Sequence, residues 1–302
     1  MSAPVPASVR ALLAGAIDYA GLFPPAALSM ADAVAEYLAC RAAPERWALG
    51  RFVVPAARLG EFGAAAKAAG LIPAPAGDPV PLSALAAADA AAGVEAIVAF
   101  HTAHRHLGCE VLAVECRATT PEEAARVTAL IPPPLECWVE IPLGPPPGPL
   151  IEAVLGGGGR PKIRVGGVVP DLFPQPDDLL GFLIEAVRRE TPFKATAGLH
   201  HPLRGTYPYT YDPASAVGPM FGYLNLFVAT ALLLDGAPPA DARRALLEED
   251  LEALELTDGG LTWRGRRLDL STLRRLRRDG LRAFGSCSFR EPMHDLLPLL
   301  LP

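Results

Sequence analysis

The chain has 302 residues, a formal net charge of -6 and 51% hydrophobic residues. This balance excludes the strongly basic surface of a nucleic-acid-binding domain and allows a large buried core. The longest apolar stretch, 220–234, contains Asn225 and is shorter than the roughly 20 residues of a membrane helix, so we expect neither a nucleic-acid nor a membrane partner.

Short apolar segments alternate along the chain with helical patterns. We predict strands at 15–23, 51–54, 80–85, 111–117, 137–142, 162–166, 193–198 and 282–288, and helices at about 30–41, 57–69, 89–106 and 177–189, with further helices after Thr120 and before the glycines 156–159. Such alternation predicts an α/β fold with a parallel sheet and crossover helices. Eight units predict a closed (β/α)8 TIM barrel, as a single domain over 1–302.

Residues 199–281, between the seventh and eighth predicted strands, break this alternation. They contain an apolar helix, two further helical runs and the turn residues 258–260, which are typical of a hairpin. We interpret the arginine-rich run 272–278 as a solvated helix face, because it is short and balanced by nearby acids. The whole segment is expected to form an insertion over the top face, where the strands have their carboxyl ends, within the same domain.

Polar side chains lie along the predicted strands, toward the carboxyl ends where barrel enzymes place their active sites. They are Asp18 on the first strand, Glu115 and Arg117 on the fourth, Glu140 on the fifth, Lys162 and Arg164 on the sixth, Lys194 and Thr196 on the seventh, and Ser286 and Ser288 on the eighth. Alternation of faces along the strands predicts that Glu115 and Glu140 point into the barrel. A network of buried salt bridges is one interpretation. An active site is the other, because imperfectly paired buried charges are costly and ionisable clusters in a cleft often mark function.

The lysines are the most informative of these residues. Only three of the 27 Lys and Arg residues are Lys, and two of them, Lys162 and Lys194, lie on predicted strands. A lysine beside other cations in a partly dry site loses basicity and becomes a nucleophile for Schiff-base chemistry, with Glu115, Glu140 or Asp18 moving protons. The same cations can instead bind a phosphate or carboxylate without covalent chemistry.

Three motifs carry a resemblance to a known family. They are KIRVGG at 162–167, FKATAG at 193–198 and FGSCS at 284–288, and they resemble the corresponding strands of the deoxyribose-phosphate aldolase group of class I aldolases. The resemblance implies a barrel with Lys162 as the Schiff-base residue, Lys194 as its cationic neighbour, and Gly285 with Ser286 as oxyanion or phosphate donors. Arg164 and the long insertion depart from the family pattern, and position alone favours Lys194 as the nucleophile.

Histidines after the seventh strand support a different chemistry. His200 or His201 could bind a metal together with Glu115 or Glu140 in a metal-dependent lyase or hydrolase, or serve as a general acid/base or a substrate hydrogen-bond donor. Arg204, with the tyrosines that follow it, suits the binding of an anion. We assign no metal and no other cofactor.

The sequence thus predicts an aldolase-like lyase that acts on a small anionic carbonyl compound, phosphorylated or carboxylated. A metal-dependent barrel enzyme and a noncatalytic small-anion-binding protein are the alternatives, and a homo-oligomer stays an open option. Five cysteines without a Cys-x-x-Cys pair indicate free thiols in a reducing compartment. The first ten residues contain no basic segment followed by an apolar core, so we expect no secretory signal and a cytoplasmic location.

Overall fold

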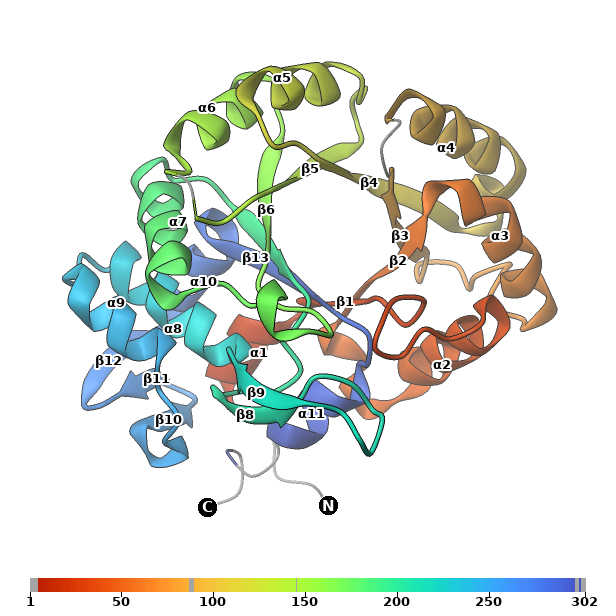
Figure 1. Cartoon of the computed structure of the whole chain (residues 1–302). Helices are drawn as coiled ribbons and strands as arrows, with labels where there is room; N and C mark the ends of the chain where they lie inside the picture. Colours follow the sequence, from red (N-terminus) through yellow and green to blue (C-terminus); the bar gives the residue numbers. More distant parts are fainter. Residues whose placement is uncertain (1–4, 87–89, 145, 297–298, 300–302) are drawn as a thin grey trace.

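The computed structural model describes residues 5–86, 90–144, 146–296 and 299, and its centre is a closed barrel of eight parallel strands (Figure 1). Around the barrel the strands follow the order β1-β13-β7-β6-β5-β4-β3-β2. Their bounds are β1 Ile17–Tyr19, β2 Leu49–Pro55, β3 Val80–Leu85, β4 Cys109–Arg117, β5 Glu136–Ile141, β6 Arg160–Arg164, β7 Phe193–Thr196 and β13 Leu281–Ser286. The predicted (β/α)8 TIM barrel is confirmed.

Helices surround the barrel on its outer side (Figure 1). They are α1 Ala7–Leu13, α2 Met30–Ala42, α3 Leu59–Ala68, α4 Ala90–His104, α5 Pro121–Ala129, α6 Gly148–Gly156, α7 Pro176–Arg188, α8 Tyr223–Leu234, α9 Pro239–Leu246, α10 Leu270–Asp279 and α11 Arg290–Leu296. The start of α5 is specified locally, because Pro121 occupies its first turn and the Thr120 hydroxyl accepts a hydrogen bond from the Glu123 N–H at 3.2 Å. In the described part of the chain, no helix is both long and apolar enough to cross a membrane.

The segment between β7 and β13 has two parts. The first is an antiparallel hairpin of β8 Gly205–Pro208 and β9 Val217–Met220, followed by α8, which packs against α7, α10 and β13. The second contains α9, α10 and a sheet of β10 Leu254–Thr257, β11 Gly260–Trp263 and β12 Arg266–Asp269. The predicted turn at 258–260 joins β10 to β11. In Figure 1, α9 and this sheet lie outside the barrel, so the segment extends well beyond the top face.

Aromatic side chains fill the space between the barrel and its first helices. Tyr19, Tyr37, Phe52 and Phe62 are fully or almost fully buried, and the rings of Phe52 and Phe62 have centroids 4.9 Å apart. Each such side chain contributes roughly 2 to 3 kcal/mol through its removal from water. This packing anchors β1 and β2 and therefore fixes the position of Asp18, which the next section places in the candidate site.

Candidate active site

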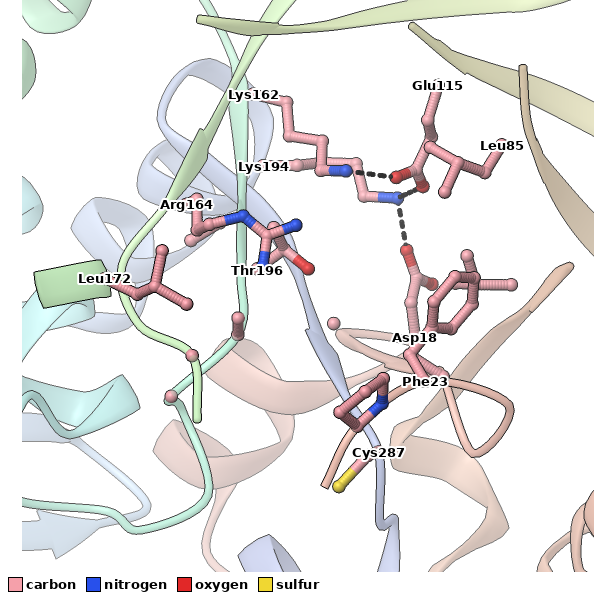
Figure 2. A pocket seen from close by; sticks show the side chains of 18 of the residues that line it. Asp18, Phe23, Leu85, Glu115, Lys162, Arg164, Leu172, Lys194, Thr196 and Cys287 are labelled. Carbon is pink, nitrogen blue, oxygen red and sulfur yellow. Dashed lines mark hydrogen bonds and ion pairs between the residues drawn. The ribbon is translucent and has the colours of Figure 1, made fainter. Parts of the chain in front are cut away.

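Five charged side chains meet inside the barrel and form what we call the charged layer: Asp18, Glu115, Glu140, Lys162 and Lys194. Lys162 Nζ lies 2.8 Å from Glu115 Oε2 and 3.0 Å from Glu140 Oε2. Lys194 Nζ lies 2.6 Å from Glu115 Oε1 and 2.6 Å from Asp18 Oδ2 (Figure 2). Glu115 therefore bridges the two lysines, and each lysine contacts two carboxylates.

Strand register brings these residues to one level of the barrel. Lys162 pairs with Glu140 on one neighbouring strand and with Lys194 on the other. Because side chains alternate between the two faces of a strand, Glu115 and Glu140 point into the barrel as predicted, where they contact the lysines. Closure of the barrel between β1 and β13 adds Asp18 to the layer.

Hydrogen-bond donors on neighbouring strands fix two carboxylates of the charged layer, those of Glu115 and Asp18, and a glycine leaves room for one of them. The Ser83 hydroxyl donates to Glu115 Oε1 at 2.7 Å, and the Arg51 backbone N–H donates to Asp18 Oδ1 at 2.8 Å. A Cβ added to Gly50 would lie only 2.4 Å from that Asp18 oxygen. Glycine at position 50 is therefore what allows Asp18 to approach the backbone of β2.

The charges of the layer are nearly balanced and stabilise one another. Burial on its own raises the pKa of the Glu115 carboxyl, but the ammonium groups of Lys162 and Lys194 outweigh burial and hold that pKa well below its usual range. Burial on its own lowers the pKa of Lys194, but the carboxylates of Asp18 and Glu115 outweigh it and raise that pKa above the ordinary lysine value. The predicted loss of basicity is therefore wrong for Lys194, because carboxylates, not cations, are its nearest charged neighbours.

A cavity of about 270 Å³ lies against this layer at the carboxyl ends of the strands (Figure 2). Four members of the layer reach it, namely Asp18, Glu115, Lys162 and Lys194. The other lining residues come from strand ends and from the segments that follow them: Ala20, Phe23, Pro24, Pro25, Val53, Leu85, Arg164, Gly167, Val168, Leu172, Ala195, Thr196, Ala197, Gly198, His200, Gly285 and Cys287. An apolar wall with a charged base is typical of small-molecule sites.

Backbone geometry at the ends of β6 and β7 shapes one wall of this cavity. Gly198 has φ +71°, and a Cβ placed on it would lie 2.9 Å from the Cα of Gly166. Ala197 also adopts a positive φ, 63°, which is uncommon for a residue other than glycine. The two chain segments therefore approach each other more closely than larger side chains allow.

Only some of the predicted substrate-binding residues line the cavity. Arg164, Thr196, His200 and Gly285 do so. The other predicted residues are His201, Arg204, Ser286 and Ser288, and they are engaged in other contacts. The Arg204 guanidinium pairs with Glu249 on the segment after α9, whereas the Ser288 hydroxyl accepts the Glu291 N–H at the start of α11.

The two predicted metal-binding histidines are paired with carboxylates of α11. His200 Nδ1 lies 2.9 Å from Glu291 Oε2, and His201 Nδ1 lies 2.5 Å from Asp295 Oδ2. Within the described residues, no group of three or more His, Cys, Asp or Glu side chains is arranged to hold a metal ion. The geometry thus gives no support to a metal centre made by these histidines with Glu115 or Glu140.

Sequence reasoning missed two residues at this site, Ser83 and Glu291. Ser83 was not singled out, although it is the only polar side chain in the predicted strand 80–85, and that isolation is a usable signal. The Tyr211 hydroxyl donates to Glu291 Oε2 at 2.9 Å and lies 3.4 Å from Cys287 Sγ. This contact joins the β8–β9 hairpin to α11 and depends on a tertiary arrangement with no local sequence pattern.

Comparison with known proteins adds no further constraint. The chain matches no protein-family model, no curated protein and no solved structure. The chemistry of the site is therefore inferred from its own geometry: two buried ammonium groups that share a carboxylate at the base of a small cavity, with a guanidinium at its wall.

Proposed function

We propose that this protein is an aldolase-like lyase that forms a Schiff base with a small anionic carbonyl compound, phosphorylated or carboxylated. One observation carries the proposal. Lys162 and Lys194 are paired in register on adjacent strands, are only 4% and 3% exposed, and both reach the same cavity. Buried lysines next to proton acceptors are the groups that carbonyl chemistry through an iminium requires.

Lys162 is the better candidate for the nucleophile. Both of its carboxylate partners are shared with other cations, since Glu115 also binds Lys194 and Glu140 lies 3.4 Å from the Arg164 guanidinium. Lys194 is held at 2.6 Å by each of its two carboxylates, and these raise its pKa. In this proposal Lys194 stays an ammonium and stabilises negative charge on Glu115 and on the substrate.

The charged layer supplies a balanced proton path for iminium formation. The Lys162 ammonium gives a proton to Glu140, and the neutral amine attacks the carbonyl carbon, forming the C–N bond and, after an internal proton shift, a carbinolamine. Glu140 then returns its proton to the hydroxyl, which leaves as water while the C–O bond breaks. The iminium has the same charge as the ammonium that it replaces, so Glu115 and Glu140 stabilise both.

Arg164 is suited to binding the anionic group of the substrate. Its side chain is 47% exposed, and its Nε lies 3.4 Å from Glu140 Oε1, which is long for a contact with a carboxylate. A guanidinium has five N–H donors, so Arg164 can bind a carboxylate or phosphate with donors that Glu140 does not use. Thr196 is the residue paired with Arg164 across β6 and β7, and it lines the same cavity.

Borohydride trapping tests the proposal directly. The protein is incubated with a panel of small aldehydes and ketones that bear a phosphate or a carboxylate, reduced, and mapped by peptide mass spectrometry. We expect an adduct on Lys162, its loss in Lys162→Arg because arginine does not deprotonate, and its partial retention in Lys194→Arg. Lys67→Arg is the matched control, because Lys67 is an exposed lysine of α3. Trapping that is absent for the whole panel, or unchanged in Lys162→Arg, rules out covalent chemistry at this residue.

A noncatalytic small-anion-binding protein is the second candidate. The observation in its favour is the close pairing of both lysines with carboxylates, together with the raised pKa of Lys194. That protein would bind phosphorylated or carboxylated compounds in the cavity through Arg164 and leave them unchanged. Saturable binding without an adduct and without product, measured by calorimetry and NMR, would support it over the lyase.

The cytoplasm is the proposed place of action. All five cysteines are free and buried, and Cys116 and Cys137 lie on the neighbouring strands β4 and β5. Free thiols of this kind support a reducing compartment.

A further inference from the structure

A second cavity, of about 450 Å³, lies at the amino-terminal end of the barrel, on the opposite side of the charged layer. We call it the lower cavity. It is lined by Ala14, Gly15, Asp18, Arg51, Glu136, Trp138, Lys194, Arg274, Arg277, Arg278, Arg282 and Ala283. Six of these residues are cations and two are acids, so the lining is strongly positive. Only Asp18 and Lys194 also line the cavity at the carboxyl ends of the strands, which we call the upper cavity.

The five arginines of the lower cavity differ in their partners. Arg51 makes two 3.0 Å contacts to the Glu136 carboxylate, and Arg278 contacts the neighbouring Asp279. For Arg274, Arg277 and Arg282, the described residues include no carboxylate at ion-pair distance. Three guanidinium groups therefore line one cavity without an ion-pair partner among the described residues.

Arg277 is the most constrained of these three. Its terminal nitrogens donate to the carbonyl oxygens of Leu12 at 2.5 Å and Ala14 at 3.2 Å, at the end of α1. Its Nε is buried and has no hydrogen-bond partner within the described structure. Burial first, and then the nearby Arg282, lower the pKa of Arg277 to about 10. An unsatisfied donor on a buried cation is costly unless an acceptor, preferably an anion, is supplied.

A purely structural role accounts for only part of this arrangement. Arginines near the end of a helix interact favourably with its dipole, and Arg277 also satisfies carbonyls at the end of α1. Neither effect explains why Arg282, on a different element, lines the same cavity as Arg274 and Arg277. Helical spacing places Arg274, Arg277 and Arg278 on one side of α10. Arg282, the second residue of β13, lines the cavity with them.

We propose that the lower cavity is a binding site for a small, multiply charged anion that carries phosphoryl or carboxylate groups. The planar guanidinium fork binds both groups in a bidentate manner. Arg274 and Arg282 provide the accessible donors, and Arg277 adds a third positive charge to the lining. This site is separate from the reaction proposed for Lys162 and does not depend on it.

Thermal unfolding with pyrophosphate, and separately with citrate, tests the site at constant ionic strength. We expect a saturable rise in Tm for the unmodified protein, since a ligand of the folded state stabilises it. The double variant Arg274→Gln/Arg282→Gln should bind at least one of these anions about tenfold or more weakly, because charge-assisted hydrogen bonds are lost. Both side chains are exposed, so the variant should fold. The anion that binds more tightly shows whether the site prefers phosphoryl or carboxylate groups.

Two controls separate the lower cavity from other cationic sites. Arg126→Gln, at an exposed arginine of α5, should bind like the unmodified protein. Arg164→Gln removes the guanidinium at the wall of the upper cavity and should keep the stabilisation that belongs to the lower one. Three outcomes would each overturn the proposal. The first is that neither anion raises Tm in a saturable way. The second is that the anions raise Tm of the double variant as much as that of the unmodified protein, and the third is that the rise is lost in Arg164→Gln alone.

Discussion

At the carboxyl end of the barrel each buried lysine contacts two carboxylates. At the amino end, Arg274, Arg277 and Arg282 line a cavity, and none of them has a carboxylate at ion-pair distance among the described residues. The two ends share Asp18 and Lys194 and lie only one layer of side chains apart. The difference shows that burial and charge do not by themselves define the role of a cationic side chain, which also depends on whether the protein provides its counter-charge. A compensated layer keeps its geometry without a ligand, while an excess of one charge is stabilised by a counter-ion.

Removal of the shared carboxylate should have the largest effect. In Glu115→Gln, two buried ammonium groups lose their common partner, and breaking a buried ion pair costs about 3 to 5 kcal/mol. Urea denaturation should show a fall of this size in the free energy of unfolding. Glu122→Gln, at an exposed acid of α5, should change it by less than about 0.5 kcal/mol. A loss below about 1 kcal/mol in Glu115→Gln would mean that the layer is not mutually stabilised.

The pH dependence of stability should reveal the same pairing. The lowered pKa of Glu115 stabilises the folded state above the ordinary glutamate value of about 4.3, and this contribution is lost as pH falls toward the folded pKa. The raised pKa of Lys194 contributes below about 10.4 and is lost as pH rises through its folded value. Unfolding free energies measured from pH 3 to 11 should fall at both ends. Glu115→Gln should weaken the acid slope, and an identical acid slope in both proteins would count against this assignment.

Substitution of Gly50, which leaves room for the Asp18 carboxylate, should lower the free energy of unfolding by a smaller amount. In Gly50→Ala the new Cβ would lie 2.4 Å from Asp18 Oδ1 and 3.1 Å from the Ile17 carbonyl oxygen. Overpacking of this kind typically costs 1 to 3 kcal/mol and should displace Asp18 from Lys194. Gly60→Ala is the control, because that glycine lies in α3 with no atom within 4 Å of an added Cβ, and alanine there should stabilise slightly. Equal effects of the two substitutions would show that Asp18 tolerates movement.

The smallest effect should come from the lower cavity without added anion. In Arg274→Gln/Arg282→Gln, removal of two uncompensated like charges should leave the free energy of unfolding within about 0.5 kcal/mol or raise it slightly. Measurements at low and high salt should differ less for the variant than for the unmodified protein, because salt screens repulsion between exposed charges. A clear loss of stability would assign these arginines a structural role and make the two ends of the barrel alike.

The barrel could be predicted because its signals are local. Alternation of faces along a strand identified the inward positions of Glu115 and Glu140. Apolar periodicity identified α2, and acids at the start with arginines at the end identified α7. The short helix α1 and the β8–β9 hairpin were not predicted, because each depends on packing against segments distant in sequence. α1, for example, packs against α10 and β10.

The site was predicted less completely because charge pairing is a tertiary property. Residues 18 and 194 become ion-pair partners only when β1 closes on β13, so the raised pKa of Lys194 has no signature in either strand. The run 272–278 was interpreted as a solvated helix face, and this is wrong for Arg277, whose Nε is buried and whose terminal nitrogens bind carbonyls of residues 12 and 14. A run of arginines looks the same in sequence whether it meets water or a cavity.

The pairing of β1 with β13 also constrains how the chain can fold during synthesis. On the ribosome, β1 and α1 emerge early, but β1 gains its second neighbour only when residues 284–286 appear, and Leu12 meets Arg277 across a separation of 265 residues. Until then one edge of the nascent sheet and the apolar side chains Val9 and Leu12, buried in the finished fold, lack their partners. Contacts this distant form slowly, and open strand edges recruit other chains. We therefore expect the nascent chain to need protection from aggregation, for example by chaperones, until β13, its last barrel strand, has emerged from the ribosome.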